Sequence, residues 1–102
     1  MTDGTIYNIS GAVVPLKEGH TVLVRDFGDS MVPMIFSGQT VRVAPYRSEP
    51  LRKGDVVLAK VGGHLYLHKI TALRAQEVQI GNNRGKVNGW TSRAQIYGRV
   101  LK

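Results

Sequence analysis

The strongest constraint on the fold is the placement of β-branched and other apolar residues in short segments bounded by turn residues. Six such segments are rich in Val, Ile, Leu and Tyr, and no window shows a long 3.6-residue apolar period. The six are Thr21–Val24, Thr40–Val43, Val56–Lys60, Leu65–Ile70, Glu77–Ile80 and Ile96–Leu101. The turn residues that bound them are Gly28, Gly38, Pro45, Pro50, Gly54, Gly62-Gly63, Gly81-Asn82-Asn83 and Asn88-Gly89. The pattern predicts an all-β fold, a small coiled β-barrel or sandwich of about six to eight short, mostly antiparallel strands.

The chain length and local signals predict one domain. A chain of 102 residues has no room for two hydrophobic cores. Residues 1–23 have a less regular pattern, and we expect them to form a leading arm or strand. We expect residues 24–102 to form the core of the domain. Gly62-Gly63 lies between two apolar segments and predicts a tight hairpin. Residues 31–36 are long enough for one helical turn at most.

Several kinds of protein are excluded by the composition. The chain has no cysteine, which rules out disulfides, thiolate metal sites and a cysteine nucleophile. The longest uncharged stretch, which includes Thr5 to Leu16, is too short and too polar to span a membrane. The first residues also lack the basic and apolar regions of a secretory signal. We therefore expect a cytoplasmic protein with no membrane anchor.

The net charge of +7 raises the question of a nucleic-acid partner. The Lys and Arg residues are scattered along the chain, however, and no four of them are consecutive. The aromatic residues are not clustered either, as a platform for single-stranded nucleic acid would require. We expect no nucleic-acid partner, and no residue pattern indicates a cofactor or a metal site.

A Gly-Asp-Ser-Met stretch before Pro33 raises the question of whether Ser30 is a nucleophile. A serine hydroxyl needs a base within hydrogen-bond reach and donors for the oxyanion that forms. The candidate bases are His20, His64, His68 and the lysines. In an extended strand His68 would share one face with Tyr66. From these residues alone, a half-exposed strand histidine is still the commoner explanation.

Five sequence blocks in order resemble one superfamily. They are GDSMVPMIFSGQTVRV, LRKGDVVLAKV, HLYLHKI, IGNNRGKVNGW and IYGRV. This order is similar to that of the LexA-type and type I signal peptidase superfamily, whose members are serine peptidases on a coiled all-β fold. The resemblance covers about residues 24 to 101. It implies that Ser30 is the nucleophile and His68 the base, as in the Ser-His branch, with Lys69 matching the basic residue that follows.

The chain departs from the family pattern in the loop that should orient the base. In the Ser-His branch an acidic residue there holds the histidine, but this loop carries Asn82, Asn83 and Asn88. An asparagine can accept the histidine N–H through its carbonyl oxygen, although it cannot stabilise an imidazolium by charge. We expect one of the three asparagines beside His68.

Residues around Ser30 have supporting roles in this interpretation. Gly28 gives the backbone the freedom to expose Ser30 and to bring an N–H toward the oxyanion. Met31 is expected to pack beside the site. Asp29 is too close to Ser30 in sequence to be an obvious orienting group, and a solvated turn residue is its alternative. Lys69 should point away from Ser30 by strand alternation, and it is a second candidate base only if a bulge shifts the register.

The resemblance and the residues together predict a soluble serine endopeptidase that cleaves an extended peptide or protein segment in processing or maturation. We expect the substrate to pair beside an edge strand, with small side chains near the cut. The alternative is a catalytically weak or inactive peptide-binding module of the same fold, which the asparagines favour. Whether the chain cuts itself, for instance at Gly11-Ala12, or another protein stays open, as does its oligomeric state.

Overall fold

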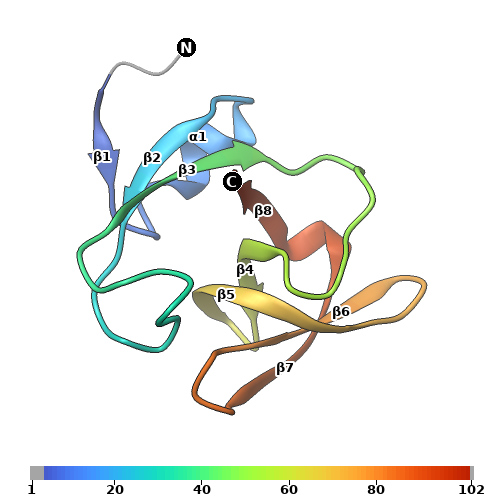
Figure 1. Ribbon diagram of the computed structural model, residues 1–102. Coiled ribbons are helices and arrows are strands. Elements are labelled where there is room, and N and C mark those ends of the chain that lie inside the picture. Colours follow the sequence, from blue (N-terminus) through green and yellow to red (C-terminus); the bar gives the residue numbers. More distant parts are fainter. Residues whose placement is uncertain (1–3, 102) are drawn as a thin grey trace.

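The computed structural model describes residues 4–101, in which eight strands form one sheet in the order β1-β2-β3-β8-β4-β5-β6-β7. The strands are β1 (Ile6–Tyr7), β2 (Val22–Arg25), β3 (Thr40–Pro45), β4 (Val56–Val61), β5 (His64–Leu73), β6 (Glu77–Gly81), β7 (Val87–Ser92) and β8 (Ile96–Val100). A short helix, α1 (Val13–Lys17), follows β1, and a 3-10 turn, η1 (Arg93–Gln95), precedes β8. The sheet coils strongly, as Figure 1 shows.

The last strand joins two parts of the sheet. β8 lies between β3 and β4 and is antiparallel to both. From β4 onward the strands β4, β5, β6 and β7 form an antiparallel meander. Only the short β1–β2 pair is parallel within residues 4–101. This topology confirms the predicted all-β class with mostly antiparallel strands.

The chain folds back at Gly62-Gly63, where the sequence predicts a tight hairpin. Val61 and His64 are partners across this turn. Gly62 and Gly63 have φ values of +56° and +85°, a left-handed conformation that a residue with a Cβ rarely adopts. The hairpin fixes the β4–β5 register, and with it the face on which His68 lies.

The sequence interpretation missed the strand β7 and the helix α1. Asn88-Gly89 was expected to be a turn, but both residues lie within β7 (Val87–Ser92). The register against β6 shifts there, because Ile80 pairs with Gly89 and Gly81 pairs with Val87. Asn88 is thus the extra residue of a β-bulge, which explains why turn-forming residues occur inside a strand. The helix α1 was missed because five residues are too few to show a helical period.

Both faces of the central strands are covered by apolar side chains. One cluster contains Val24, Val43 and Leu58, together with Ala12 and Leu16 from the α1 region. The other cluster, on the opposite face, contains Val57, Ala59, Ile70, Val78 and Ile80. β4 contributes to both clusters, which explains its uninterrupted apolar sequence Val56–Ala59.

The predicted leading arm, residues 1–23, contributes to the same core where the structure describes it. β1 pairs with β2, and the fully buried side chain of Ala12 belongs to the first cluster. Residues 1–3 and 102, which fall in the predicted arm and core, lie outside the described residues. The boundary at residue 23 stays a prediction. Within residues 4–101, no helix has the length and apolar character needed to cross a membrane.

Candidate active site

Ser30 lies on the long connection between β2 and β3. Two hydrogen bonds close this connection across its base: Gly38 N–H donates to the Asp26 carbonyl at 2.9 Å, and Gly28 N–H donates to Ser37 Oγ at 3.0 Å. Gly28 has a φ of +111°, a conformation that favours glycine. The backbone freedom expected of Gly28 is therefore used, but its own N–H is engaged by Ser37.

His68, near the middle of β5, faces Ser30. Its Nε2 atom lies 3.2 Å from Ser30 Oγ. The distance is within the roughly 4 Å expected of a loosely formed catalytic hydrogen bond. The Tyr66 ring stacks on the His68 ring with centroids 5.1 Å apart and an angle of 27° between the planes. The two rings share a face, as strand alternation predicts, and this stacking restricts the orientation of the imidazole.

The other ring nitrogen of His68 contacts Asn88. The distance from His68 Nδ1 to Asn88 Oδ1 is 2.7 Å. A carbonyl oxygen can only accept, so Nδ1 carries a proton in this arrangement, and in the neutral imidazole the Nε2 lone pair then faces Ser30. The β7 bulge places Asn88 at this point, because the extra residue turns its side chain relative to the regular ladder. Such a chain of groups allows Ser30 Oγ–H to donate to a neutral imidazole.

The two other asparagines of the loop have different contacts. Asn83 N–H donates to the Ser30 carbonyl at 2.8 Å, and Asn83 Nδ2 donates to the Met31 carbonyl at 3.1 Å. Asn82 Oδ1 accepts the N–H groups of Arg84 and Lys86 at 2.8 and 3.0 Å. Of the three asparagines expected near His68, the structure places only Asn88 in hydrogen-bond contact with it, among the described residues. Asn83 instead holds the backbone of the serine turn.

The remaining predicted residues lie around this centre. The Asp29 carboxylate is exposed and forms an ion pair with Arg84 at 3.3 Å. Met31 is buried in the first apolar cluster, where it packs beneath the serine turn. Within residues 4–101 no hydrogen bond joins Lys69 to Ser30, and Lys69 pairs with Gly81 across the β5–β6 ladder. His64 is exposed at the hairpin, and His20 is exposed after α1.

A small cavity of about 20 Å³ lies beside Ser30. Its walls include Gly28, Met31, Ile35 and Leu67. The Ser30 N–H forms no backbone hydrogen bond within residues 4–101. The same described range holds no cluster of three or more His, Asp or Glu side chains suited to a metal ion.

Sequence reasoning did not find the roles of Tyr66, Ser37 and Arg84. The contact of Tyr66 with His68 could have been inferred from the sequence, because strand alternation places both side chains on one face. Arg84 contacts Asp29, which is far from it in sequence, and Ser37 contacts Gly28 within the β2–β3 connection. No local sequence pattern shows either contact.

We expect Asn83→Ala to loosen the serine turn. It removes the side-chain hydrogen bond to the Met31 carbonyl, and thermal unfolding should show a loss of about 1 kcal/mol. The contact between Ser30 Oγ and His68 Nε2 should also be disturbed, because the serine turn is no longer held in place, and the NMR signals of the His68 ring would report this. The matched control is Arg84→Gln, which removes only an exposed ion pair and should cost about 0.5 kcal/mol or less without a change in the His68 signals. Equal effects of the two changes would contradict a specific role for Asn83.

Comparison with protein families supports the resemblance seen in the sequence. The model of the Peptidase S24-like family matches residues 3–100, almost the entire chain. No curated protein matches the chain. The match extends beyond the five sequence blocks and includes β1 and α1. The chain belongs to the Peptidase S24-like family, within the LexA and signal peptidase-like superfamily.

Proposed function

We propose that the protein is a serine endopeptidase that cleaves an extended peptide segment with Ser30 as nucleophile and His68 as general base. The observation that supports this most is the continuous contact from Asn88 through His68 to Ser30, at 2.7 and 3.2 Å. Membership of a peptidase family supports the same reaction class. Asn88 stands where the Ser-His branch of the superfamily carries an acidic residue. A peptide-binding module without strong catalytic activity is therefore the second candidate function.

The proposed reaction follows the acyl-enzyme route. Ser30 Oγ attacks the carbonyl carbon of the scissile bond while His68 Nε2 takes the hydroxyl proton. The Ser30 N–H donates to the oxyanion that forms. His68 then gives the proton to the leaving amine, and the carbon–nitrogen bond breaks. Water, activated by the same nitrogen, hydrolyses the ester and frees Ser30.

Asn88 orients His68, but it gives the imidazolium less stabilisation than an acidic residue would. Its carbonyl oxygen holds the histidine in the tautomer that leaves Nε2 free to accept a proton. A neutral amide stabilises the imidazolium less than a carboxylate does, because it supplies a dipole and not a charge. The proposal therefore predicts a slow enzyme relative to members that carry an acid at this position.

The edge of β5 beside His68 fits an extended substrate. β5 pairs with β6 only from Lys69 onward, so the half that runs from His64 to His68 has a partner on one side, β4. Ile70 N–H donates to the Asp55 carbonyl on the β4 side. Since backbone groups alternate along a strand, those of Leu65 and Leu67 point to the open side. A peptide added there would pass directly along Ser30.

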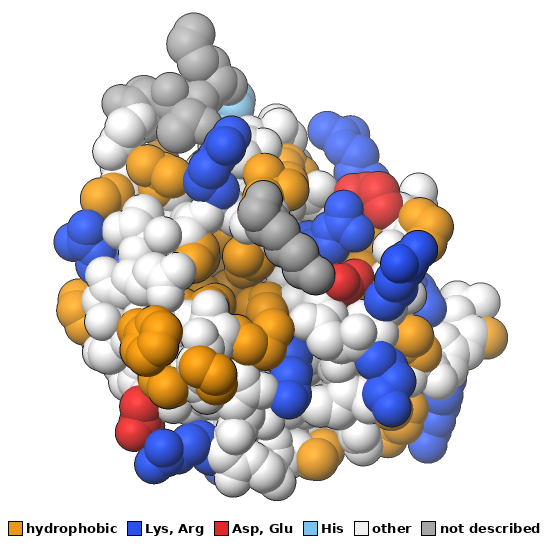
Figure 2. Space-filling view, in the orientation of Figure 1, with side chains coloured by type: hydrophobic (Ala, Val, Ile, Leu, Met, Phe, Trp, Pro, Cys, Tyr) orange, Lys and Arg blue, Asp and Glu red, His pale blue; other side chains and the backbone are white. Residues whose placement is uncertain are grey.

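Apolar side chains surround the serine turn. Phe27, Met34 and Phe36 are 74%, 43% and 56% exposed, which is unusual for large apolar residues. Hydrophobic side chains gather over the β2–β3 connection at the lower left of Figure 2. Together with the small cavity beside Ser30, this supports a substrate with a small residue at the cut and apolar residues near it.

The described structure favours cleavage of another chain over cleavage at Gly11-Ala12. Ala12 is fully buried in the core. Gly11 N–H donates to Asn8 Oδ1 at 2.7 Å in the turn that leads into α1. An extended conformation at this bond would require both features to be lost. Cleavage of a separate peptide would not require this loss of structure.

We expect Asn88→Asp to raise the turnover number at least about tenfold. A carboxylate accepts the His68 N–H in the same place and adds charge stabilisation, and the reverse change in a serine protease triad costs about 10⁴. The carboxylate favours the protonated imidazole, so the acidic limb of the pH–rate profile should move to higher pH. Steady-state kinetics across about pH 5 to 9 would measure both effects.

Two controls make this experiment specific. Asn82→Asp introduces the same charge in the neighbouring β6–β7 loop, at a side chain that accepts only loop N–H groups, and it should leave the rate nearly unchanged. Asn88→Ala should lower the rate, because the tautomer is no longer selected. No difference between Asn88→Asp and wild type in rate and pH profile would remove Asn88 from the mechanism.

A further inference from the structure

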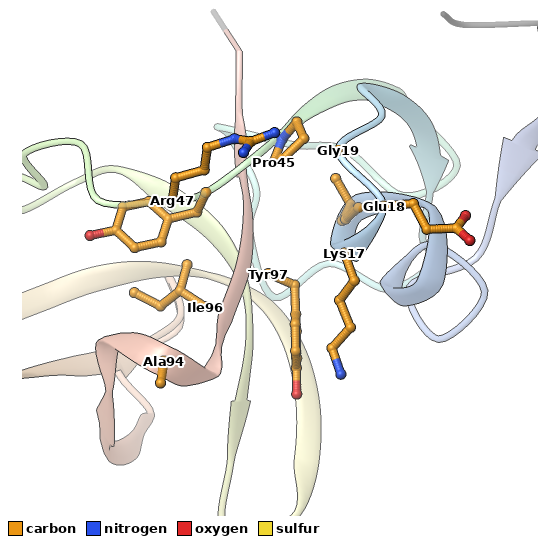
Figure 3. A pocket seen from close by; sticks show the side chains of 10 residues that line it. Lys17, Glu18, Gly19, Pro45, Arg47, Ala94, Ile96 and Tyr97 are labelled. Atoms are coloured by element: carbon orange, nitrogen blue, oxygen red, sulfur yellow. The ribbon is translucent and has the colours of Figure 1, made fainter.

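A second hollow lies away from Ser30, between α1 and the η1–β8 segment. Its volume is about 380 Å³, and none of its lining residues lines the small cavity beside Ser30. Figure 3 shows the elements that form it: the end of α1, the chain that leaves β3, and the turn into β8. It is the larger of these two hollows, and the proposed peptidase reaction does not use it.

Two cations border this hollow. Lys17 comes from the last turn of α1, and its Nζ atom lies 5.5 Å from the centre of the Tyr97 ring. Arg47 comes from the connection after β3, and its guanidinium packs against Gly19, where an added Cβ would lie 3.1 Å from it. Within residues 4–101 neither side chain forms an ion pair. Both charges are therefore available to a bound anion.

The acidic residue of the lining does not neutralise them. Figure 3 shows the Glu18 side chain directed away from Lys17 and Arg47. Glu49, two residues after Arg47, accepts the backbone N–H groups of Arg47 and Ser48 at 2.9 Å each. Its carboxylate oxygen is thus engaged by its own turn. The lining therefore holds two cations against one carboxylate, in a chain whose net charge is +7.

The lining between the two cations combines polar groups with apolar side chains. Its apolar part, the floor, consists of the buried Leu16 and Ile96, and Pro45, Tyr46 and Tyr97 also line the hollow. In the view of Figure 3, the Arg47 guanidinium and the Lys17 amino group lie at opposite edges of the lining. One compact anion would not contact both groups. An elongated ligand with separated negative charges and an apolar part between them matches this arrangement.

We propose that this hollow binds an acidic protein segment, with an apolar side chain on the floor and carboxylates beside Lys17 and Arg47. Charge complementarity and the apolar floor together select this kind of partner. The proposal is independent of Ser30 chemistry, because it concerns a different surface. It gives the protein a means of holding an acidic partner, whether or not that partner is cleaved.

The test uses two defined peptides and NMR spectra of the ¹⁵N-labelled protein. One probe is acetyl-Glu-Glu-Leu-Glu-Glu-amide, and the other is its uncharged counterpart, acetyl-Gln-Gln-Leu-Gln-Gln-amide. We expect the acidic peptide to shift amide signals of residues 16–19, 45–47 and 94–97, and the uncharged one to bind at least about tenfold more weakly. Binding of the acidic peptide should weaken as salt rises from about 50 to 300 mM.

Matched variants separate this site from the general basic surface. The double change Lys17→Gln/Arg47→Gln should weaken binding of the acidic peptide at least about tenfold. Arg52→Gln/Lys53→Gln removes the same charge from exposed residues outside the hollow and should have little effect. The spectra of both variants also report whether they fold. Equal losses in the two double variants, or signal shifts spread over the molecule, would overturn the proposal. Equal binding of the two peptides would overturn it as well.

Discussion

Replacement of Ser30 by alanine is expected to lower kcat/KM for a cleaved peptide by at least about 10³-fold. The change removes the only atom that the proposal assigns to covalent attack. Within residues 4–101 Ser30 Oγ makes one hydrogen bond, to His68, so its loss should cost at most about 1 kcal/mol of folding stability. Peptide affinity should be retained, because the proposal attributes it to main-chain pairing along β5 and to apolar contacts.

Three measurements on the same variant separate the possible outcomes. Thermal unfolding reports the fold, fluorescence anisotropy of a labelled peptide reports binding, and product analysis reports cleavage. A Ser30→Ala protein that is folded, binds the peptide and still cleaves it at the wild-type rate would contradict the nucleophile assignment. Loss of binding together with cleavage would show that the hydroxyl serves recognition.

Replacement of His68 by alanine is expected to cost nearly as much as replacement of Ser30. Without a base the hydroxyl remains protonated at neutral pH and is a weak nucleophile. The double variant should be no slower than the worse single variant by more than a few-fold, because groups that act as one unit give non-additive losses. Kinetics of the two single variants and the double variant would measure this directly.

The matched control for His68 is the next residue along β5. Lys69→Ala should change the rate by less than about threefold, since Lys69 lies on the opposite side of the strand and makes no hydrogen bond to Ser30 within the described residues. A Lys69→Ala loss as large as that of His68→Ala would favour a lysine base. If the rate reduction in the double variant equals the product of the reductions in Ser30→Ala and His68→Ala, the two residues have independent roles.

The sequence predicted the fold well where local chemistry determines it. The β4–β5 hairpin follows from Gly62-Gly63 between two apolar segments, and the two positive φ values require the glycines. β7 was missed because Asn88-Gly89 is typical of a turn, yet a bulge tolerates the same residues. The position of β8 between β3 and β4 could not be predicted, because it depends on pairing between segments far apart in sequence.

The sequence indicated which residues form the candidate site, but not which of them contact one another. The resemblance indicated Ser30 and His68, and strand alternation placed His68 and Tyr66 on one face. The sequence left three asparagines as equal candidates for the group beside His68. Their separate contacts depend on the loop conformation: Asn82 bonds loop N–H groups, Asn83 holds the serine turn, and Asn88 lies at a bulge beside the imidazole.

The most direct test of the peptidase proposal is mass spectrometry of a peptide library incubated with the protein in ¹⁸O-labelled water. The library should contain extended peptides with a small residue flanked by apolar ones, and Ser30→Ala serves as the blank. The proposal predicts that wild type yields product pairs in which the new carboxyl group carries ¹⁸O, and that Ser30→Ala yields none. Equal products from both proteins would contradict the proposal. Binding by both proteins without any product would establish the peptide-binding module in its place.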